Sequence, residues 1–235
     1  MSLSHNYPWQ LITAMSRPLP LSLQLGRQYD AQKLQAEVHD VLTRFAAASQ
    51  HGYYHDGGWK AVCLVAANGD YREDRFLPDA DYLKTEAVPR GGYLESIIDE
   101  FGETKRVRIL NLTAKKNIFW HIDDGDSVDE KRVRLHIPVR TNADVFFQIS
   151  HEDERWIPGQ LWYGDFTFPH RIYNSGEESR IHIVMDLDAD ERVRSLFADE
   201  YLAQARKRSR LRKTCQWLCK LYSFRPILQH RILKR

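Results

Sequence analysis

Between residues 105 and 188 the sequence consists of short runs of strand-forming residues, each separated from the next by turn residues. The predicted strands are 106–113, 117–123, 131–140, 144–150, 160–163, 167–174 and 179–187. Many short strands at this spacing are typical of an antiparallel sandwich or barrel, because a strand can bury its apolar face only against a second layer. We therefore predict a mainly β fold of the jelly-roll or cupin type.

Helical patterns flank this strand-rich region. Apolar residues recur at helical spacing through residues 30–49, and Asp30 can cap the first turn. A second helical region is predicted from residue 189 to residue 222, with an interruption at Pro226, because proline removes a helical hydrogen bond. The lead-in, 1–27, is expected to be irregular with edge-strand pieces. The predicted parts of the chain are a lead-in with a helix (1–57), a β domain (58–188) and a basic helical tail (189–235).

Length and composition exclude several classes of protein. With 235 residues, 43% of them hydrophobic, the chain is expected to form one globular domain with an appendage. The sequence contains no run of 18 apolar residues, so we expect no membrane-spanning helix. The N-terminus lacks the pattern of a signal peptide. Three cysteines fit a reducing compartment, so we expect a cytoplasmic location. No nucleotide-binding or nucleic-acid-binding motif occurs, and nucleic acid is not an expected partner.

Two consecutive predicted strands carry polar side chains on one face. Successive side chains of a strand point to opposite faces, so His121 and Asp123 share a face. In the next strand, Arg134 and His136 lie opposite an entirely apolar face. Burying such groups without partners is unfavourable. This polar face is therefore either solvated or arranged around a metal ion and an anion.

The same residue types point to a metal centre. Fe(II) oxygenases commonly bind their metal through two histidines and one carboxylate. His121 and Asp123 can supply two of these ligands, and His170, after a Gly-containing turn, is the best candidate for the third. Ten residues later Arg180 begins a strand on which His182 shares its face. A buried arginine needs an anion, and a carboxylate suits its forked guanidinium.

Each of these residues taken singly also has an ordinary structural interpretation. His121 and Asp123 could be a solvated pair, and His170 could be a turn residue. Arg180 and His182 could pair with Asp186 or Glu178 on an exposed face, and we expect His182 to be structural or to lie near the site. Only the ordered combination of motifs favours a metal centre.

This ordered combination resembles the aspartyl/asparaginyl β-hydroxylase family, which includes bacterial proline hydroxylases that use iron and 2-oxoglutarate. The matching segments are Gly58-Trp59-Lys60, HID at 121–123, RLHIPV at 134–139, PGQLWYGDFTFPH at 158–170, and Arg180. They lie within 58–188, a little over half of the chain. The resemblance implies a double-stranded β-helix core with an N-terminal helix and C-terminal helices.

The resemblance also implies roles for individual residues. His121, Asp123 and His170 would hold Fe(II) at the catalytic centre, and Arg180 would pair with the distal carboxylate of 2-oxoglutarate. His136 would help to bind this cosubstrate, and Arg134 would contact cosubstrate or substrate. O2 would be the second cosubstrate, and ascorbate the reductant.

Asp123 indicates the type of reaction that the resemblance implies. Animal members of the family lack this carboxylate, and related iron halogenases carry a small residue there that admits chloride. The carboxylate in this chain therefore favours hydroxylation. Two departures from the family pattern are the long acidic loop at 123–130 (DDGDSVDE) and the lack of a matching upstream Ser or Tyr contact for the cosubstrate, for which Asn111 is a guess.

The substrate is less constrained. Family members act on free amino acids, peptide residues, carrier-bound aminoacyl groups and lipid acyl chains. Arg134 suggests an anionic group on the substrate, whereas the acidic loop 123–130 and the turn 51–58 could attract an amine. An amino acid, or an aminoacyl or peptidyl side chain, satisfies both. A catalytically silent cupin-like binding protein is an alternative, which the complete set of motifs disfavours.

Charge is distributed unevenly along the chain. Residues 201–235 contain 11 of the 34 Lys and Arg residues and no Asp or Glu, which leaves 23 basic against 32 acidic residues in 1–200. The tail 204–235 could pack on the barrel or in a dimer interface with its charges solvated, which we favour. Alternatively, it could lie on an anionic membrane surface as a basic amphipathic helix. The protein would then be peripheral to the inner face of the membrane and could hydroxylate a lipid acyl chain.

Overall fold

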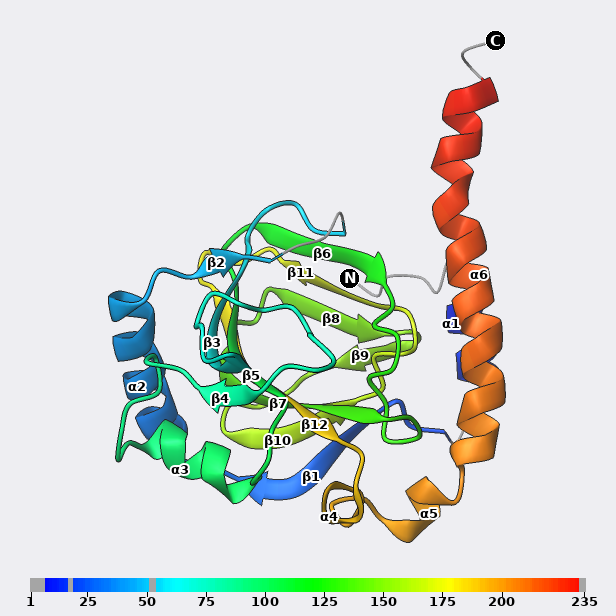
Figure 1. Ribbon diagram of the computed structural model, residues 1–235. Helices are drawn as coiled ribbons and strands as arrows, with labels where there is room; N and C mark the ends of the chain where they lie inside the picture. The colour runs from blue at the N-terminus through cyan, green and yellow to red at the C-terminus, as the bar shows by residue number, and fades with distance from the viewer. Residues whose placement is uncertain (1–6, 17–18, 51–53, 233–235) are drawn as a thin grey trace.

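The computed structural model describes the backbone of residues 7–16, 19–50 and 54–232, and side chains as far as residue 222. Two antiparallel sheets face each other (Figure 1). The larger sheet contains, in spatial order, β1 (Ser22–Gln28), β10 (Gln160–Gly164), β7 (Arg132–Arg140), β12 (Arg180–Asp188), β5 (Arg106–Leu112), β3 (Trp59–Ala67) and β2 (Ala48–Ser49), with β4 (Tyr82–Lys84) also paired to β3. The smaller sheet contains β6 (Lys116–His121), β11 (His170–Asn174), β8 (Val145–Ile149) and β9 (Glu152–Glu154). This arrangement confirms the predicted double-stranded β-helix.

The outer face of the larger sheet is apolar and packs against two helices. These are α2 (Ala31–Arg44) and α3 (Tyr93–Glu100), which lie side by side against the sheet in Figure 1. Leu34 and Val38 of α2 belong to the same buried cluster as Ile137 of β7 and Ile183 of β12. Burial of these side chains from water is the main force that holds the helices to the sheet.

The inner face of the same sheet carries polar side chains on β7 and β12, as strand alternation predicted, beside a small apolar cluster that includes Leu110 and Val184. On β7 the buried apolar side chains occupy alternate positions, and Arg134 and His136 lie between them. On β12 the same alternation places Arg180, His182 and Asp186 opposite the apolar residues. The interior between the two sheets is therefore lined by charged and imidazole side chains.

The helix predicted for 30–49 starts at the expected place but ends early. The Asp30 carboxylate accepts hydrogen bonds from the backbone amides of Gln32 and Lys33, which caps α2. The helix ends at Arg44, and Ala48–Ser49 instead forms strand β2, which pairs with β3. The prediction of helix up to residue 49 was wrong because an edge of the sheet was available to this segment.

The N-terminal lead-in is more regular than predicted. It contains the helix α1 (Pro8–Met15) in addition to β1, which is an edge strand of the larger sheet. Trp9 of α1 is almost fully buried, and it belongs to an apolar cluster with Cys215 and Cys219. Because β1 and β2 pair with strands of the core, the lead-in packs as part of the barrel. The proposed division at residue 58 stays a prediction.

Beyond the barrel the chain forms three helices, α4 (Glu191–Arg194), α5 (Asp199–Leu202) and α6 (Ala205–Ile232). The first part of α6 lies beside α1 and the barrel, and its far end extends away from both (Figure 1). The predicted interruption at Pro226 was wrong, since α6 continues to Ile232. A proline inside a helix costs roughly 3 kcal/mol, which weakens a helix without forbidding it. No helix in the described part of the chain combines the length and the hydrophobicity needed to span a bilayer.

Candidate active site

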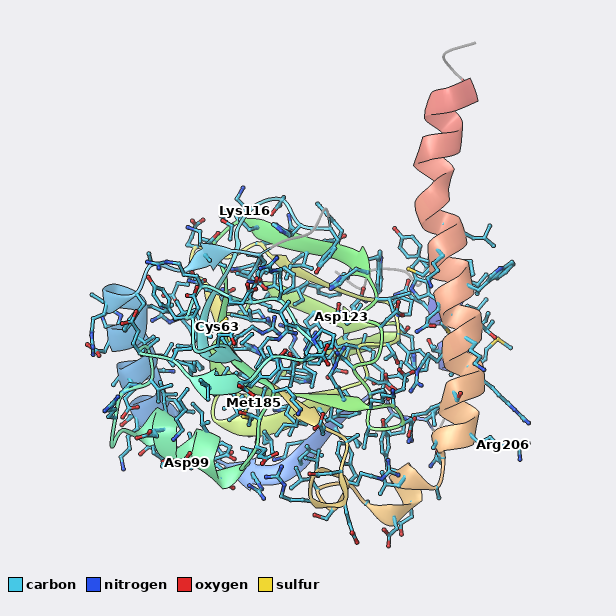
Figure 2. All side chains as sticks on the ribbon, in the orientation of Figure 1. Cys63, Asp99, Lys116, Asp123, Met185 and Arg206 are labelled. Carbon is cyan, nitrogen blue, oxygen red and sulfur yellow. The ribbon has the colours of Figure 1, made fainter. Side chains whose placement is uncertain are left out.

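Three predicted metal ligands come together at one end of the barrel interior. His121 ends β6 and pairs directly with His170 at the start of β11, and their ring centroids are 4.0 Å apart. Asp123 follows β6 by two residues, and one potential ligand atom from each of the three side chains lies within 4.8 Å of the others. Figure 2 shows Asp123 among the side chains of the barrel, on the side nearer to α6. The structure thus places the three side chains where one metal ion could contact all of them.

Backbone carbonyl groups orient both imidazoles. Nδ1 of His121 lies 2.8 Å from the Phe119 carbonyl oxygen, and Nδ1 of His170 lies 3.1 Å from the Phe168 carbonyl oxygen. Each Nδ1–H can donate to its carbonyl, so Nε2 keeps its lone pair for a metal. Nε2 of His121 lies 3.7 Å from Oδ1 of Asp123. The hydrogen bonds from Nδ1 to the two carbonyl oxygens fix each ring in the orientation that a metal-binding histidine requires.

The protonation states of the triad also suit a metal ion. Burial, followed by the neighbouring His121, lowers the pKa of His170 to about 3. Burial also lowers the pKa of His121. For Asp123 burial alone would raise the pKa, but Arg134 and the two imidazoles outweigh burial and hold its pKa far below the ordinary value. Two neutral imidazoles and one carboxylate at neutral pH match the donor set of Fe(II) sites in oxygenases.

Arg134 joins the triad to a buried ion network. Its guanidinium forms an ion pair with Asp123, and others with Asp126 at 2.6 Å and Asp186 at 2.7 Å. β12 lies between β7 and β5, so Asp186 is the direct cross-strand neighbour of both Arg134 and Arg106. Arg134 therefore orients the Asp123 carboxylate. Its predicted contact with cosubstrate or substrate stays a prediction.

Arg180 is a buried cation for which the described part of the chain supplies no carboxylate. It is 6% exposed, and burial alone lowers its pKa to about 9. Its nearest polar contact is His182, with Nη2 3.4 Å from Nδ1, and its guanidinium lies over the ring of Phe147. The alternative in which Arg180 pairs with Asp186 was wrong, because Asp186 is bound by arginines of β5 and β7. The alternative partner Glu178 likewise forms no ion pair with Arg180. An anion from outside the chain is the expected partner of Arg180.

A continuous series of rings links the triad to Arg180. Phe166 lies between His170 and His136, with ring centroids at 4.8 and 4.9 Å. His136 in turn lies 3.4 Å from His182, measured between the Nδ1 atoms, and its buried Nε2 has no hydrogen-bond partner among the described residues. Arg180 and His182 also line a pocket of about 350 Å³. These contacts connect His170 to His136 and Arg180 through the barrel interior.

A second pocket, of about 330 Å³, is lined by Asp123 of the triad. Tyr54 and Trp59 contribute aromatic walls to it, and Arg108 contributes a buried guanidinium. Arg108 makes one ion pair, with Nη2 3.2 Å from Asp186, and its Nε has no hydrogen-bond partner among the described residues. Arg108 was not among the predicted site residues, although strand alternation puts it on the inner face of β5.

The predicted contact of Asn111 with the cosubstrate was wrong. Asn111 shares the outer face of β5 with Val107 and Ile109, so it does not face the cosubstrate side of the barrel. Most carboxylates of the acidic loop 123–130 are paired with arginines of the chain itself, which leaves Asp124 exposed at the second pocket. Within the turn 51–58, residues 51–53 lie outside the described part of the chain.

Comparisons with known proteins agree with this geometry. The sequence model of the family described as aspartyl/asparaginyl beta-hydroxylase matches residues 28–190, a range that contains the triad and Arg180. L-proline cis-4-hydroxylase from Rhizobium meliloti (strain 1021) is 24% identical over 162 residues. That match spans 66% of this chain and 58% of the length of the relative.

The fold is also similar to solved structures at low sequence identity. An oxidoreductase of the 2OG-Fe(II) oxygenase family from Burkholderia pseudomallei superposes with a TM-score of 0.51 at 12% identity, covering 79% of this chain and 93% of that one. A prolyl hydroxylase from Trichoplax adhaerens, in complex with a fragment of hypoxia inducible factor, gives a TM-score of 0.49 at 12% identity, covering 81% and 92%.

Proposed function

The chain belongs to the aspartyl/asparaginyl β-hydroxylase family, and we propose that it is an Fe(II)- and 2-oxoglutarate-dependent dioxygenase. In this proposal it hydroxylates a carbon atom of an amino acid, either free or within an aminoacyl or peptidyl group. One observation carries the proposal. A triad of two neutral histidines and an ionised aspartate shares the barrel interior with Arg180, a buried cation that has no carboxylate partner among the described residues.

The residues present fit both cofactors. His121, Asp123 and His170 would hold Fe(II), and Arg180 would pair with the distal carboxylate of 2-oxoglutarate. The buried Nε2 of His136, which has no hydrogen-bond partner among the described residues, would complete the polar contacts of this cosubstrate. When bound, Fe(II) and 2-oxoglutarate activate O2, so that one oxygen atom enters a substrate C–H bond and the other enters succinate, with release of CO2.

The protein itself supplies position and protection from water. The carbonyl groups of Phe119 and Phe168 hold the two imidazoles in the tautomer that presents Nε2. Phe166 and Trp156 pack around His136 and exclude water from the cosubstrate side. Arg134 keeps Asp123 ionised and oriented, so that no proton has to leave the carboxylate before metal binding.

The second pocket supports an amino acid as the substrate class. Arg108 lines this pocket together with Asp123, its Nε has no hydrogen-bond partner among the described residues, and its guanidinium would bind a carboxylate. Asp124 is exposed at the same pocket and would attract an ammonium group. Tyr54 and Trp59 would enclose the carbon skeleton between these charged groups. Ascorbate would act as the reductant that keeps the iron in the Fe(II) state.

Succinate formation tests this function directly. We would incubate the protein anaerobically with Fe(II), ascorbate and 2-oxoglutarate, add O2, and compare a panel of free amino acids. Turnover that one amino acid stimulates and that is lost in Asp123→Ala would support the dioxygenase. Asp124→Ala should keep the basal turnover of 2-oxoglutarate but respond less to that amino acid. Metal binding without any 2-oxoglutarate turnover would instead favour the silent cupin-like binding protein.

A membrane-surface location is a second proposal, which would suit a lipid acyl substrate. The observation that favours it is the outer face of α6, where Trp217 is 62% and Leu221 is 48% exposed. Exposed Lys213 and Lys220 lie on the same helix, and each basic residue near anionic lipid contributes roughly 1 kcal/mol. The protein would then be cytoplasmic and peripheral to the inner face of the membrane.

Flotation with vesicles that contain anionic lipid tests the membrane proposal. The full chain is expected to float, and the double variant Trp217→Ser/Leu221→Ser is expected to stay at the bottom. Flotation of neither protein would contradict a membrane location and leave the amino acid as the substrate class.

A further inference from the structure

Helix α6 lies outside the part of the chain that matches the family, yet it is bound into the barrel by buried charges. The family match ends at residue 190, and α6 begins at Ala205. Two arginines one helical turn apart on α6, Arg208 and Arg212, are 0% and 4% exposed. Arg206 on the same helix points away from the barrel into solvent (Figure 2). The inward arginines therefore have a role that the solvated ones do not share.

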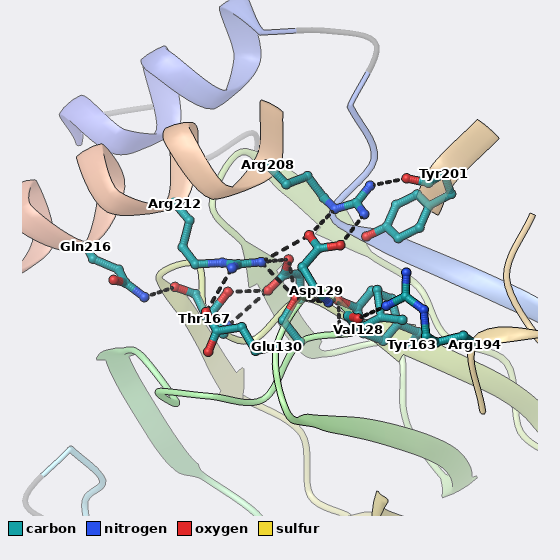
Figure 3. A network of polar contacts seen from close by, with 12 residues as sticks. Val128, Asp129, Glu130, Tyr163, Thr167, Arg194, Tyr201, Arg208, Arg212 and Gln216 are labelled. Atoms are coloured by element: carbon teal, nitrogen blue, oxygen red, sulfur yellow. Dashed lines mark hydrogen bonds and ion pairs between the residues drawn. The ribbon is translucent and has the colours of Figure 1, made fainter. Parts of the chain in front are cut away.

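Arg208 anchors the start of α6. Its Nε and Nη2 atoms bind the Asp129 carboxylate at 2.7 and 2.6 Å, in a two-pronged ion pair. Nη1 donates to the carbonyl oxygen of Tyr201, and the guanidinium lies over the Tyr201 ring at 3.7 Å from its centroid (Figure 3). The ion pair between Arg208 and Asp129 attaches α6 to the acidic loop that begins at Asp123.

Arg212 bridges two separate loops, as Figure 3 shows. Its Nη1 atom lies 2.8 Å from Glu130, and its Nη2 atom lies 2.8 Å from Ser127, both in the loop that follows Asp123. The same Nη2 atom lies 3.1 Å from Asp165, in the turn that precedes His170. One guanidinium thus joins the loop after one proposed metal ligand to the turn before another.

The turn at 165–169, which Arg212 binds through Asp165, forms hydrogen bonds with two of the proposed metal ligands. The backbone amide of Phe168 donates to the carbonyl oxygen of Asp165, and the Phe168 carbonyl oxygen in turn orients His170. The backbone amide of Asp123 donates to the Phe166 carbonyl oxygen at 3.0 Å. This turn therefore sets both the ring of His170 and the backbone of Asp123.

A third residue of α6 holds the same turn. Nε2 of Gln216, one helical turn beyond Arg212, donates to the carbonyl oxygen of Thr167 at 3.0 Å. Asp165 is fully buried, and Thr167 donates to its carboxylate from both its amide and its hydroxyl group. Without Arg212 this buried carboxylate would lose its only ion pair among the described residues. The turn would then have to move so that the Asp165 carboxylate could reach water.

We infer that α6 holds the proposed metal ligands in position, and that Arg212 and Gln216 are positioning residues for His170 and Asp123. The inference rests on the proposed metal-binding role of the triad, and it adds to that role an element that lies beyond the family match. The helix fixes the distance between two ligands that come from different loops. It does so from outside the barrel, without touching metal or substrate.

Metal affinity of the full-length, metal-free protein tests the inference. We would titrate Co(II) anaerobically and follow its visible absorption, which needs no turnover. Loss of a group that orients metal ligands typically weakens binding about 10–100-fold, and for Arg212→Met we expect about 10-fold. Arg212→Lys should recover part of the affinity, because it keeps the charge but cannot reach all the acceptors of the forked guanidinium.

Gln216→Ala is the milder variant, should Arg212→Met fail to fold. It removes one neutral hydrogen bond to the turn, so we expect a folded protein that binds Co(II) a few-fold more weakly. Two controls separate positioning from loss of stability. Arg210→Met removes an exposed charge from the same helix, and Leu34→Ala destabilises the core on the far side of the larger sheet. Both should keep the Co(II) affinity of the unaltered protein at temperatures well below unfolding.

The outcomes distinguish this inference from the proposed function. Unchanged Co(II) affinity in Arg212→Met and Gln216→Ala would overturn the role of α6, and so would an equal loss in Leu34→Ala. If Asp123→Ala binds Co(II) as tightly as the unaltered protein, the triad is not the metal site, and the proposed function fails as well. Weaker binding in the two α6 variants and in Asp123→Ala, with both controls unchanged, would support the inference.

Discussion

Asp186 is the centre of the buried ion network, and Asp186→Asn is the perturbation with the clearest expected result. Its carboxylate is 1% exposed and accepts from three arginines. The closest contacts are 2.6 Å to Arg106, 2.7 Å to Arg134 and 3.2 Å to Arg108. Asparagine keeps the shape of the side chain, removes the charge, and turns an amide donor toward guanidinium donors. The effect of the substitution therefore reports the charge.

The expected loss of stability depends on which polar partners each arginine keeps in Asp186→Asn. Arg134 retains Asp123 and Asp126, and Arg106 retains the carbonyl oxygen of Asp74. Arg108 loses its only ion pair among the described residues and becomes an uncompensated buried cation. Breaking a buried pair in this way typically costs about 3–5 kcal/mol. In a domain of this size, 1 kcal/mol corresponds to roughly 2–4 °C in Tm, so the expected loss is roughly 6–20 °C.

Thermal and urea unfolding of the metal-free protein at pH 7 would measure this loss. The matched control is Asp188→Asn, on the same strand, where a half-exposed carboxylate pairs with Lys105 at 3.2 Å. An exposed pair contributes about 0–1 kcal/mol, so the control should hardly change Tm. A loss below 1 kcal/mol in Asp186→Asn, or equal losses in the two variants, would refute the view that Asp186 compensates the buried arginines.

Three further predictions concern pH, cosubstrate and substrate. The pKa of His170 is lowered to about 3, against 6.5 for an ordinary histidine, so unfolding takes up a proton between these values. The free energy of unfolding of the metal-free protein should have its full value above pH 6.5. It should decrease as the pH falls toward 3, by up to about 1.4 kcal/mol per pH unit for each such histidine. Urea unfolding at pH 7 and pH 5 checks this, and a flat profile contradicts it; His182→Gln, which removes another buried histidine, should make the slope shallower. Arg180→Met should raise the KM for 2-oxoglutarate roughly 10–100-fold, since charged hydrogen bonds contribute about 1.5–3 kcal/mol, and an unchanged KM in the succinate assay would remove Arg180 from the cosubstrate site. Arg108→Met should raise the KM for the amino-acid substrate while Tm and the KM for 2-oxoglutarate stay close to their original values; a selective effect on 2-oxoglutarate would reverse the assignment of the two pockets.

The local pattern of the sequence determined the strands and the direction of their side chains. Strand alternation has a fixed period of two, so it placed Arg134, His136, Arg180 and His182 on the inner face correctly. The order of the motifs indicated the family, and the family match confirms that identification. These features depend on neighbouring residues and on spacing along the chain, which a sequence shows directly.

Only the tertiary structure decided which charges meet. Asp186 pairs with arginines of β5 and β7 because β12 lies between those strands, and nothing in the spacing of the residues specifies that neighbour. In the same way, the uneven charge of body and tail did not reveal that Arg208 and Arg212 bind the acidic loop. A count of charges cannot separate a solvated arginine from a buried one. That difference depends on the closure of the barrel and on the position of α6, which are set by the packing of residues far apart in the chain.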